Sequence, residues 1–104
     1  MAKKVHVVFE LTMPNRGSWN GRWSGENQGH YIFKDFSPAA FEKEWKEKII
    51  GSWCYTWDDG WTACIASRVV DGTELRNLRK QNAGFLGYDW MVKDILAYGK
   101  IKPR

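Results

Sequence analysis

The chain has 104 residues, the length of a single domain, and we expect one domain over residues 1–104. Hydrophobic residues (43%) and charged residues (27%) occur at the frequencies of folded proteins, which excludes a wholly disordered chain. No apolar run reaches the ~18 residues of a membrane span, and no apolar segment follows the first residues as in a signal peptide. We therefore expect a cytoplasmic protein without a membrane partner.

The net charge is +4 and the isoelectric point is about 9.2. This excess of cations favours anionic partners, but solubility alone explains a charge of this size equally well. The seven Trp residues are the outlying feature of the composition, because so small a chain cannot bury all of their rings. Partly exposed Trp rings are typical of stacking sites and interfaces.

Two strands are predicted in the first third of the chain. Val5–Met13 is rich in β-branched residues and is followed by Pro14, and His30–Phe36 is predicted as the second strand. Between them, over Asn15–Gly29, glycine recurs at every fourth position, which excludes a stable helix. We expect a long, shaped loop there.

A helix is predicted after the second strand, with Ser37 as its N-cap and Gly51 beyond its end. Phe41, Trp45 and Ile49 are four residues apart and form the stripe that we expect to be buried. The charged residues between them are predicted to face solvent.

The segment Gly51–Val70 is predicted to form a β-hairpin. Asp58-Asp59-Gly60 suits a three-residue turn with Gly60 in the left-handed conformation. A two-residue turn would change the register of the hairpin. The three-residue turn pairs Trp57 with Trp61, and Cys54 with Cys64.

Two short helices are predicted to follow the hairpin. Either Asp71 or Thr73 caps the first, and Asp89 caps the second, which stops at Gly99. The order β-β-α-β-β-α-α predicts an α+β fold. We expect an antiparallel sheet of about four strands with two or three helices packed on one face.

The sequence carries no recognisable catalytic motif, and we expect a protein that is not an enzyme and uses no cofactor. His6 and His30 are the available imidazole bases, and neither stands at a spacing known from nucleophilic catalysis. Cys54 and Cys64 lack a metal-ligand spacing, so no metal site is expected. Because no secretion signal is seen, we expect both cysteines to be reduced, although the three-residue turn would place them opposite each other.

The glycine-rich loop combines the side chains that a flat, anionic ligand requires. Trp stacks on a nucleobase, Arg pairs with phosphate and an amide reads the edge of the base. The alternative is that Trp19 and Trp23 fold back over the core while the glycines form turns. The ligand-binding residues predicted from this loop, with two further Trp that complete a stacking wall, are Arg16, Trp19, Asn20, Arg22, Trp23, Trp61 and Trp90.

A second group of basic residues gathers at the exit of the hairpin and on the helix after it. Such a group is the footprint of a nucleic-acid-binding surface, although dispersed solvated side chains would look the same in the sequence. Its members are Arg68, Arg76, Arg79 and Lys80, to which Lys3, Lys4, Lys100, Lys102 and Arg104 would add.

Three short stretches resemble the phage-encoded Thoeris anti-defence family: Trp19-Asn20-Gly21-Arg22, Gly60-Trp61-Thr62-Ala63 and Tyr88-Asp89-Trp90-Met91-Val92. Members of that family carry an early Trp-Asn-Gly-Lys motif and an Asp-Trp pair near the end. The resemblance implies a protein that sequesters a nucleotide-derived immune signal. This sequence departs from the pattern in having Arg22 in place of Lys and a predicted helix at its end.

Three functions follow as hypotheses. The first is a non-enzymatic protein that binds an anionic, nucleotide-like small molecule through the glycine-rich loop. The second is a nucleic-acid-binding module that uses the basic helix. The third is an interaction module that inhibits a host protein, with the Trp rings as its anchor. The oligomeric state, a homo-oligomer included, is left open.

Overall fold

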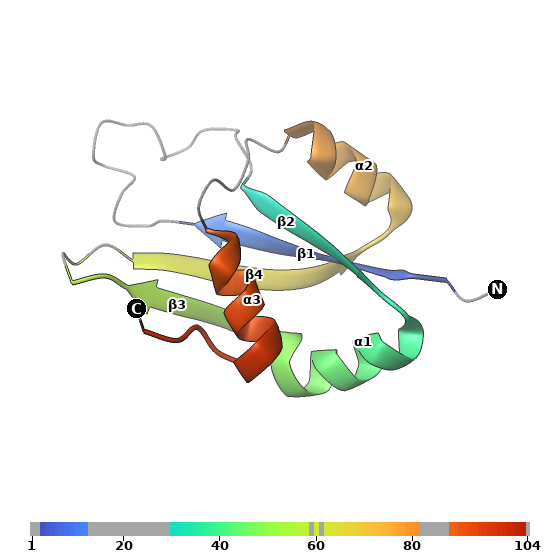
Figure 1. Cartoon of the computed structure of the whole chain (residues 1–104). Coiled ribbons are helices and arrows are strands. Elements are labelled where there is room, and N and C mark those ends of the chain that lie inside the picture. Colours follow the sequence, from blue (N-terminus) through green and yellow to red (C-terminus); the bar gives the residue numbers. More distant parts are fainter. Residues whose placement is uncertain (1–2, 13–29, 59, 61, 82–87, 104) are drawn as a thin grey trace.

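The computed structural model describes residues 3–12, 30–58, 60, 62–81 and 88–103. In this part of the chain four strands form one antiparallel sheet, in the order β2-β1-β4-β3 (Figure 1). The strands are β1 (Val5–Thr12), β2 (Tyr31–Phe36), β3 (Ser52–Thr56) and β4 (Thr62–Val70). The predicted α+β class and antiparallel sheet are therefore confirmed.

Three helical segments accompany the sheet. The first is α1 (Pro38–Glu44), which continues without a break into the single π-helical turn η1 (Trp45–Ile49). The second is α2 (Gly72–Gln81) and the third is α3 (Asp89–Tyr98).

The larger core lies on one face of the sheet, under α3 and η1. Side chains in β-strands alternate between the two faces, so Val7 and Phe9 of β1 point to the same side. Both are fully buried, as are Ile65 of β4 and Met91 of α3. We expected two or three helices on one face of the sheet, and the first and the last helix share this face.

The helix α2 packs on the opposite face, against a smaller cluster. Val8 is fully buried and points away from its neighbours Val7 and Phe9. It contacts Leu75 and Leu78, the inward-facing residues of α2. Figure 1 shows α2 on one side of the sheet and α1 with α3 on the other. Over β3, this second face has no cover from α2, and Ser52, Cys54 and Thr56 are exposed.

Most helices begin and end where the local signals in the sequence predict. The Ser37 hydroxyl accepts a hydrogen bond from the Ala40 N–H at 3.2 Å, as an N-cap does. Gly51 has φ 121°, and Gly99 ends α3 with φ 78°, values that L side chains rarely adopt. Asp71, rather than Thr73, caps α2, because its carboxylate accepts the Glu74 N–H at 2.8 Å.

Two details of the helices differ from the prediction. Asp89 is not the cap of α3, because Tyr88 occupies that position, without a capping hydrogen bond from its side chain. The helix after Ser37 ends in a π turn, in which the Ile50 N–H reaches back to the Trp45 carbonyl at 3.0 Å. Of the predicted buried stripe, Ile49 is fully buried, whereas Phe41 and Trp45 are half-buried.

The C-terminal segment returns along α3 and is anchored at two points. The Trp53 indole N–H donates to the Gly99 carbonyl at 3.0 Å. The Lys102 N–H donates to the carboxylate of Asp94 at 3.1 Å, and Asp94 is only 5% exposed. These bonds hold residues 99–102 against β3 and α3.

Candidate functional site

Most of the ligand-binding residues predicted from the sequence lie outside the described residues. Trp90 is described: it is half-buried in the first turn of α3. The predicted residues outside the described part of the chain are Arg16, Trp19, Asn20, Arg22, Trp23 and Trp61.

Trp90 is one of four aromatic side chains that lie together and that we call the aromatic cluster: Tyr55, Trp57, Tyr88 and Trp90. The ring of Tyr55 meets Trp90 edge to face, with centroids 5.3 Å apart, and meets Trp57 in the same manner at 5.1 Å. Trp57 in turn meets Tyr88 at 6.2 Å. Each such edge-to-face pair contributes about 0.5–1.5 kcal/mol beyond the area it buries.

Two elements hold the aromatic cluster. Tyr55 lies in β3 and Trp57 directly follows this strand, and both pack against the core on the face that α3 covers. Tyr88 and Trp90 come from the start of α3, where the Met91 N–H bonds to the Tyr88 carbonyl at 3.1 Å. Tyr55 is buried, whereas the other three rings are half-buried and keep part of their surface accessible.

Of these four rings, sequence reasoning named only Trp90 as a ligand-binding residue. Strand alternation gives Tyr55 and Trp57 the same face but does not connect this face with α3. Tyr88 was missed because the signal for it lies in the fold: only the packing of α3 on β3 brings Tyr88 beside Trp57.

Each of the four strands has one end on the side of the sheet where the hairpin turns, and the aromatic cluster lies at this end of the sheet. Thr56 pairs with Thr62 at the end of the β3–β4 ladder, and Thr12 pairs with Cys64. The Leu11 N–H donates to the His30 carbonyl at 2.9 Å, so the chain leaves β1 and returns to β2 at this same end. Thr12 and His30, the described residues on either side of the predicted loop, thus lie at the end of the sheet where the cluster lies.

The described charges next to the aromatic cluster are acidic. Asp58 follows Trp57, Asp89 lies between Tyr88 and Trp90, and both carboxylate-bearing residues are exposed. Asp89 forms an ion pair with Lys93 at 3.6 Å, which offsets part of its charge. Cationic recognition of a ligand at the cluster would therefore have to come from beyond these residues.

The hairpin has the register of the predicted three-residue turn. Cys54 pairs with Cys64, the Gly60 N–H bonds to the Trp57 carbonyl at 2.9 Å, and Gly60 has φ 91°. The expected apposition of Trp57 with Trp61 involves a residue outside the described part of the chain.

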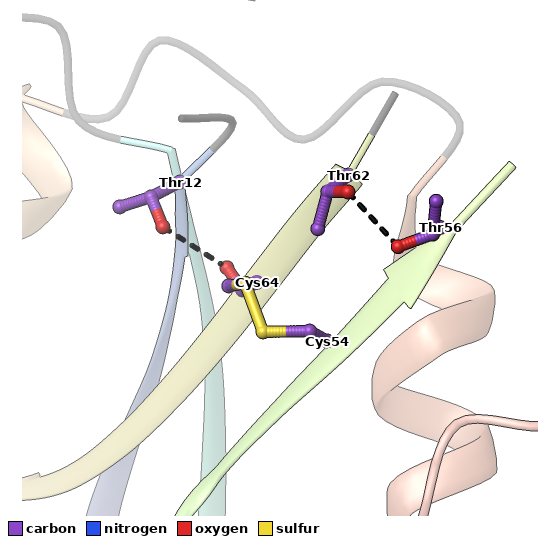
Figure 2. Close-up of a disulfide and its surroundings, with 5 residues drawn as sticks. All are labelled: Thr12, Cys54, Thr56, Thr62 and Cys64. Atoms are coloured by element: carbon purple, nitrogen blue, oxygen red, sulfur yellow. Dashed lines mark hydrogen bonds between the residues drawn. A yellow bond between two sulfur atoms is a disulfide. The ribbon is translucent and has the colours of Figure 1, made fainter. Parts of the chain in front are cut away.

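The expectation of reduced cysteines is wrong, because Cys54 and Cys64 form a disulfide across β3 and β4 (Figure 2). Their Cα atoms are 4.1 Å apart, close to the spacing of a non-hydrogen-bonded antiparallel pair. The hydroxyls of Thr56 and Thr62 form a hydrogen bond at 2.9 Å beside it. On its other side, the Thr12 hydroxyl donates to the Cys64 carbonyl at 3.4 Å.

The basic residues predicted as a nucleic-acid surface are divided among different contacts. Arg68 is paired with Glu74. The Arg79 guanidinium lies over the Phe33 ring at 5.5 Å, and Arg76 and Lys80 are exposed on α2.

The terminal lysines lie at separate places. Lys3 and Lys4 line an open pocket of about 500 Å³ beside the start of α2. Lys102 lies over the Tyr98 ring at 4.6 Å, beyond the far end of α3. The terminal cations therefore do not extend the α2 group into one patch, and Arg104 lies outside the described residues.

His6 contacts an acidic side chain across the sheet. Its Nδ1 lies 2.7 Å from Asp35 Oδ1 across β1 and β2, and both side chains are accessible, at 28% and 39%. A His–carboxylate pair is part of a nucleophilic triad, but the thiols that could complete one are joined in the disulfide. Among the described residues, no three His, Cys, Asp or Glu side chains are grouped to hold a metal ion.

Within the described part of the chain, no helix has both the length and the apolar character needed to cross a bilayer. Comparison of the sequence and the structure with protein-family models, curated proteins and solved structures finds no match. The resemblance to the Thoeris anti-defence family and the expected cytoplasmic location therefore both stay predictions.

Proposed function

We propose that this protein binds, without transforming it, a planar and anionic ligand of nucleotide type at the end of the sheet where the aromatic cluster lies. The observation that carries the proposal is the cluster itself. The half-buried rings of Trp57 and Trp90 contact the buried Tyr55, and the half-buried ring of Tyr88 contacts Trp57. Such rings offer fixed stacking surfaces, and one stacked base contributes about 1–3 kcal/mol to binding.

The anionic part of the ligand is assigned to the loop between β1 and β2. β1 ends and β2 begins at the same end of the sheet as the cluster, as the bond from Leu11 to His30 shows. The loop sequence carries Arg16 and Arg22, which supply the positive charge that an anionic ligand requires. Asp58 and Asp89, which are acidic, cannot supply it. The proposal therefore makes the two arginines necessary for an anionic ligand, with Trp19, Asn20 and Trp23 as further contacts.

A thermal-shift screen tests this function. The panel consists of mononucleotides, cyclic di- and trinucleotides, ADP-ribose derivatives and short single-stranded RNA. A ligand present at 100 times its Kd stabilises a protein by about 2.7 kcal/mol, which raises the Tm of a domain of this size by roughly 10 °C or more. A panel that shifts nothing would contradict the proposal and direct the search to a protein partner.

Charge-matched variants locate the site. We expect the double variant Arg16→Gln/Arg22→Gln to lose the thermal shift. The control Arg76→Gln/Lys80→Gln removes the same charge from α2 and should retain it. Loss of the shift in both variants would mean that net charge, and not the loop, governs binding.

A second function is favoured by the exposed cations of α2. Arg76, Arg79 and Lys80 are all exposed on one helix, and the last two are neighbours of the first at three and four residues. The binding of single-stranded nucleic acid at α2 would weaken as the salt concentration rises. The slope of log K against log salt would be about −0.7 for each phosphate neutralised. In that case the α2 double variant, and not the loop variant, would lose binding to RNA.

The resemblance to the Thoeris anti-defence family specifies one form of the first function, in which the ligand is a nucleotide-derived immune signal. The ADP-ribose derivatives of the panel address it directly. Stabilisation by them, together with their recovery unchanged after the protein is denatured, would support sequestration over catalysis.

A further inference from the structure

We propose that the Cys54–Cys64 disulfide is a redox switch that holds the aromatic cluster in order. The bond joins two neighbouring strands at the central pair of their ladder. Beyond it, the ladder contains the pairs Tyr55–Ala63 and Thr56–Thr62, and Trp57 follows immediately.

A reductant in solution can reach the disulfide. Cys54 is exposed and Cys64 is half-buried, on the face of the sheet opposite the larger core. The helix α2 covers this face over Val8 and Val70, and the buried cluster beneath it contains no residue of β3. Accessible disulfides are the ones that exchange readily with thiols, whereas buried ones resist reduction.

The strand that carries the disulfide depends on it more than a central strand would. β3 has five residues and lies at the edge of the sheet, where β4 is its one partner among the described strands. Its backbone N–H and C=O groups at Ser52, Cys54 and Thr56 point away from β4, since Trp53 and Tyr55 alternate with them in the ladder. Without the covalent link, the two pairs beyond Cys54 are held by the ladder bonds of Tyr55 with Ala63 and by the hydroxyl bond between Thr56 and Thr62.

The strand end is connected directly to the aromatic cluster. Tyr55 follows Cys54 in the chain, and its ring contacts both Trp57 and Trp90. A displaced end of β3 would therefore separate Trp57 from Tyr88 and remove the edge-to-face contacts on which the half-buried rings depend. Trp53 is held separately by its bond to Gly99, so the start of β3 would stay in place.

The chemistry is thiol–disulfide exchange with a dithiol or with two molecules of a monothiol. The attacking thiolate displaces one protein sulfur and forms a mixed disulfide, and a second thiolate then releases the other protein sulfur. Two electrons and two protons pass to Cys54 and Cys64, and the reductant leaves as its own disulfide. Because the bond closes a loop of about 11 residues, its loss should shift the equilibrium of the strand end toward disorder by about 100-fold.

The test compares the oxidised protein with protein treated with reduced glutathione or dithiothreitol. Near-UV circular dichroism reports the packing of the Trp and Tyr rings, and amide hydrogen exchange reports each strand. On reduction we expect loss of the near-UV bands and at least tenfold faster exchange at Tyr55, Trp57 and Trp90. Exchange at Val7 and Phe9 in β1, together with the far-UV spectrum, should be unchanged.

The double variant Cys54→Ser/Cys64→Ser is the matched control. It should show the near-UV spectrum of the reduced protein under all conditions and should not respond to either reductant. Three results would each overturn the proposal: resistance of the bond to 10-fold excesses of both reductants, an unchanged near-UV spectrum after reduction, or unfolding of the whole sheet. The last would make the disulfide a general staple of the fold.

The consequence for ligand binding rests on the proposed function, but the order of the rings does not. If a nucleotide shifts the Tm of the oxidised protein, reduction should weaken its binding at least tenfold. If reduction loosens the aromatic cluster but no nucleotide binds the oxidised protein, the redox switch is supported and the proposed function alone is refuted.

Discussion

Replacement of Asp94 by Ala tests whether the buried carboxylate of α3 anchors the C-terminal segment. The carboxylate is 5% exposed and accepts the Lys102 N–H at 3.1 Å. A hydrogen bond to a charged group contributes about 1.5–3 kcal/mol, and a buried amide left without an acceptor costs about 1–3 kcal/mol. Because Lys102 is half-buried, water satisfies part of that amide. We expect Asp94→Ala to lower the free energy of unfolding by about 2 kcal/mol.

Urea unfolding followed by far-UV circular dichroism measures this loss, and the corresponding fall in Tm is roughly 10 °C. Asp94→Asn keeps an acceptor oxygen and should lose less. Lys93→Ala is the control on the same helix: its ion pair with Asp89 is exposed, and such pairs contribute less than about 1 kcal/mol. A loss for Asp94→Ala no larger than that for Lys93→Ala would refute the reasoning.

Three further predictions concern the helix ends and one titrating group. Asp71→Ala should destabilise the protein by about 1 kcal/mol in urea unfolding, because it removes the cap of α2, whereas Thr73→Ala should change little. Gly99→Ala should be destabilising by about 1 kcal/mol, because φ is 78° there, while Gly72→Ala, in open space without positive φ, should be neutral or stabilising. The pKa of Tyr31 is raised, first by burial and then by the charge of a carboxylate on β1. The folded protein thus holds this proton longer than the unfolded chain does, so stability should fall as the pH rises above ~10, and Tyr31→Phe should remove that part of the fall.

The elements of this fold are predictable because their signals are local. Alternation of apolar residues identified β1, and the capping preferences of Ser37, Gly51 and Gly99 placed the helix ends. The register of the hairpin followed from reading Asp58-Asp59-Gly60 as a three-residue turn, since such a turn with a left-handed residue allows one pairing of the two strands.

The arrangement of the helices depends on contacts that are distant in sequence. An amphipathic pattern shows that Leu75 and Leu78 face a core but does not show which face of the sheet supplies it. The structure places α2 over Val8 and Val70, on the face opposite α3. For the same reason the aromatic cluster was only partly predicted: Tyr55 and Trp57 belong together by strand periodicity, whereas Tyr88 joins them through the packing of α3.

The disulfide shows where two kinds of sequence argument conflicted. The register argument, which uses only backbone geometry, placed Cys54 opposite Cys64 and was confirmed. The argument for reduced thiols used the expected compartment, a property that backbone geometry does not determine, and it was wrong. A pair that geometry brings together and solvent can reach responds to the redox conditions around it. The state of Cys54 and Cys64 is therefore better treated as a variable of the environment than as a fixed property of the chain, and this is the basis for expecting the aromatic cluster to respond to it.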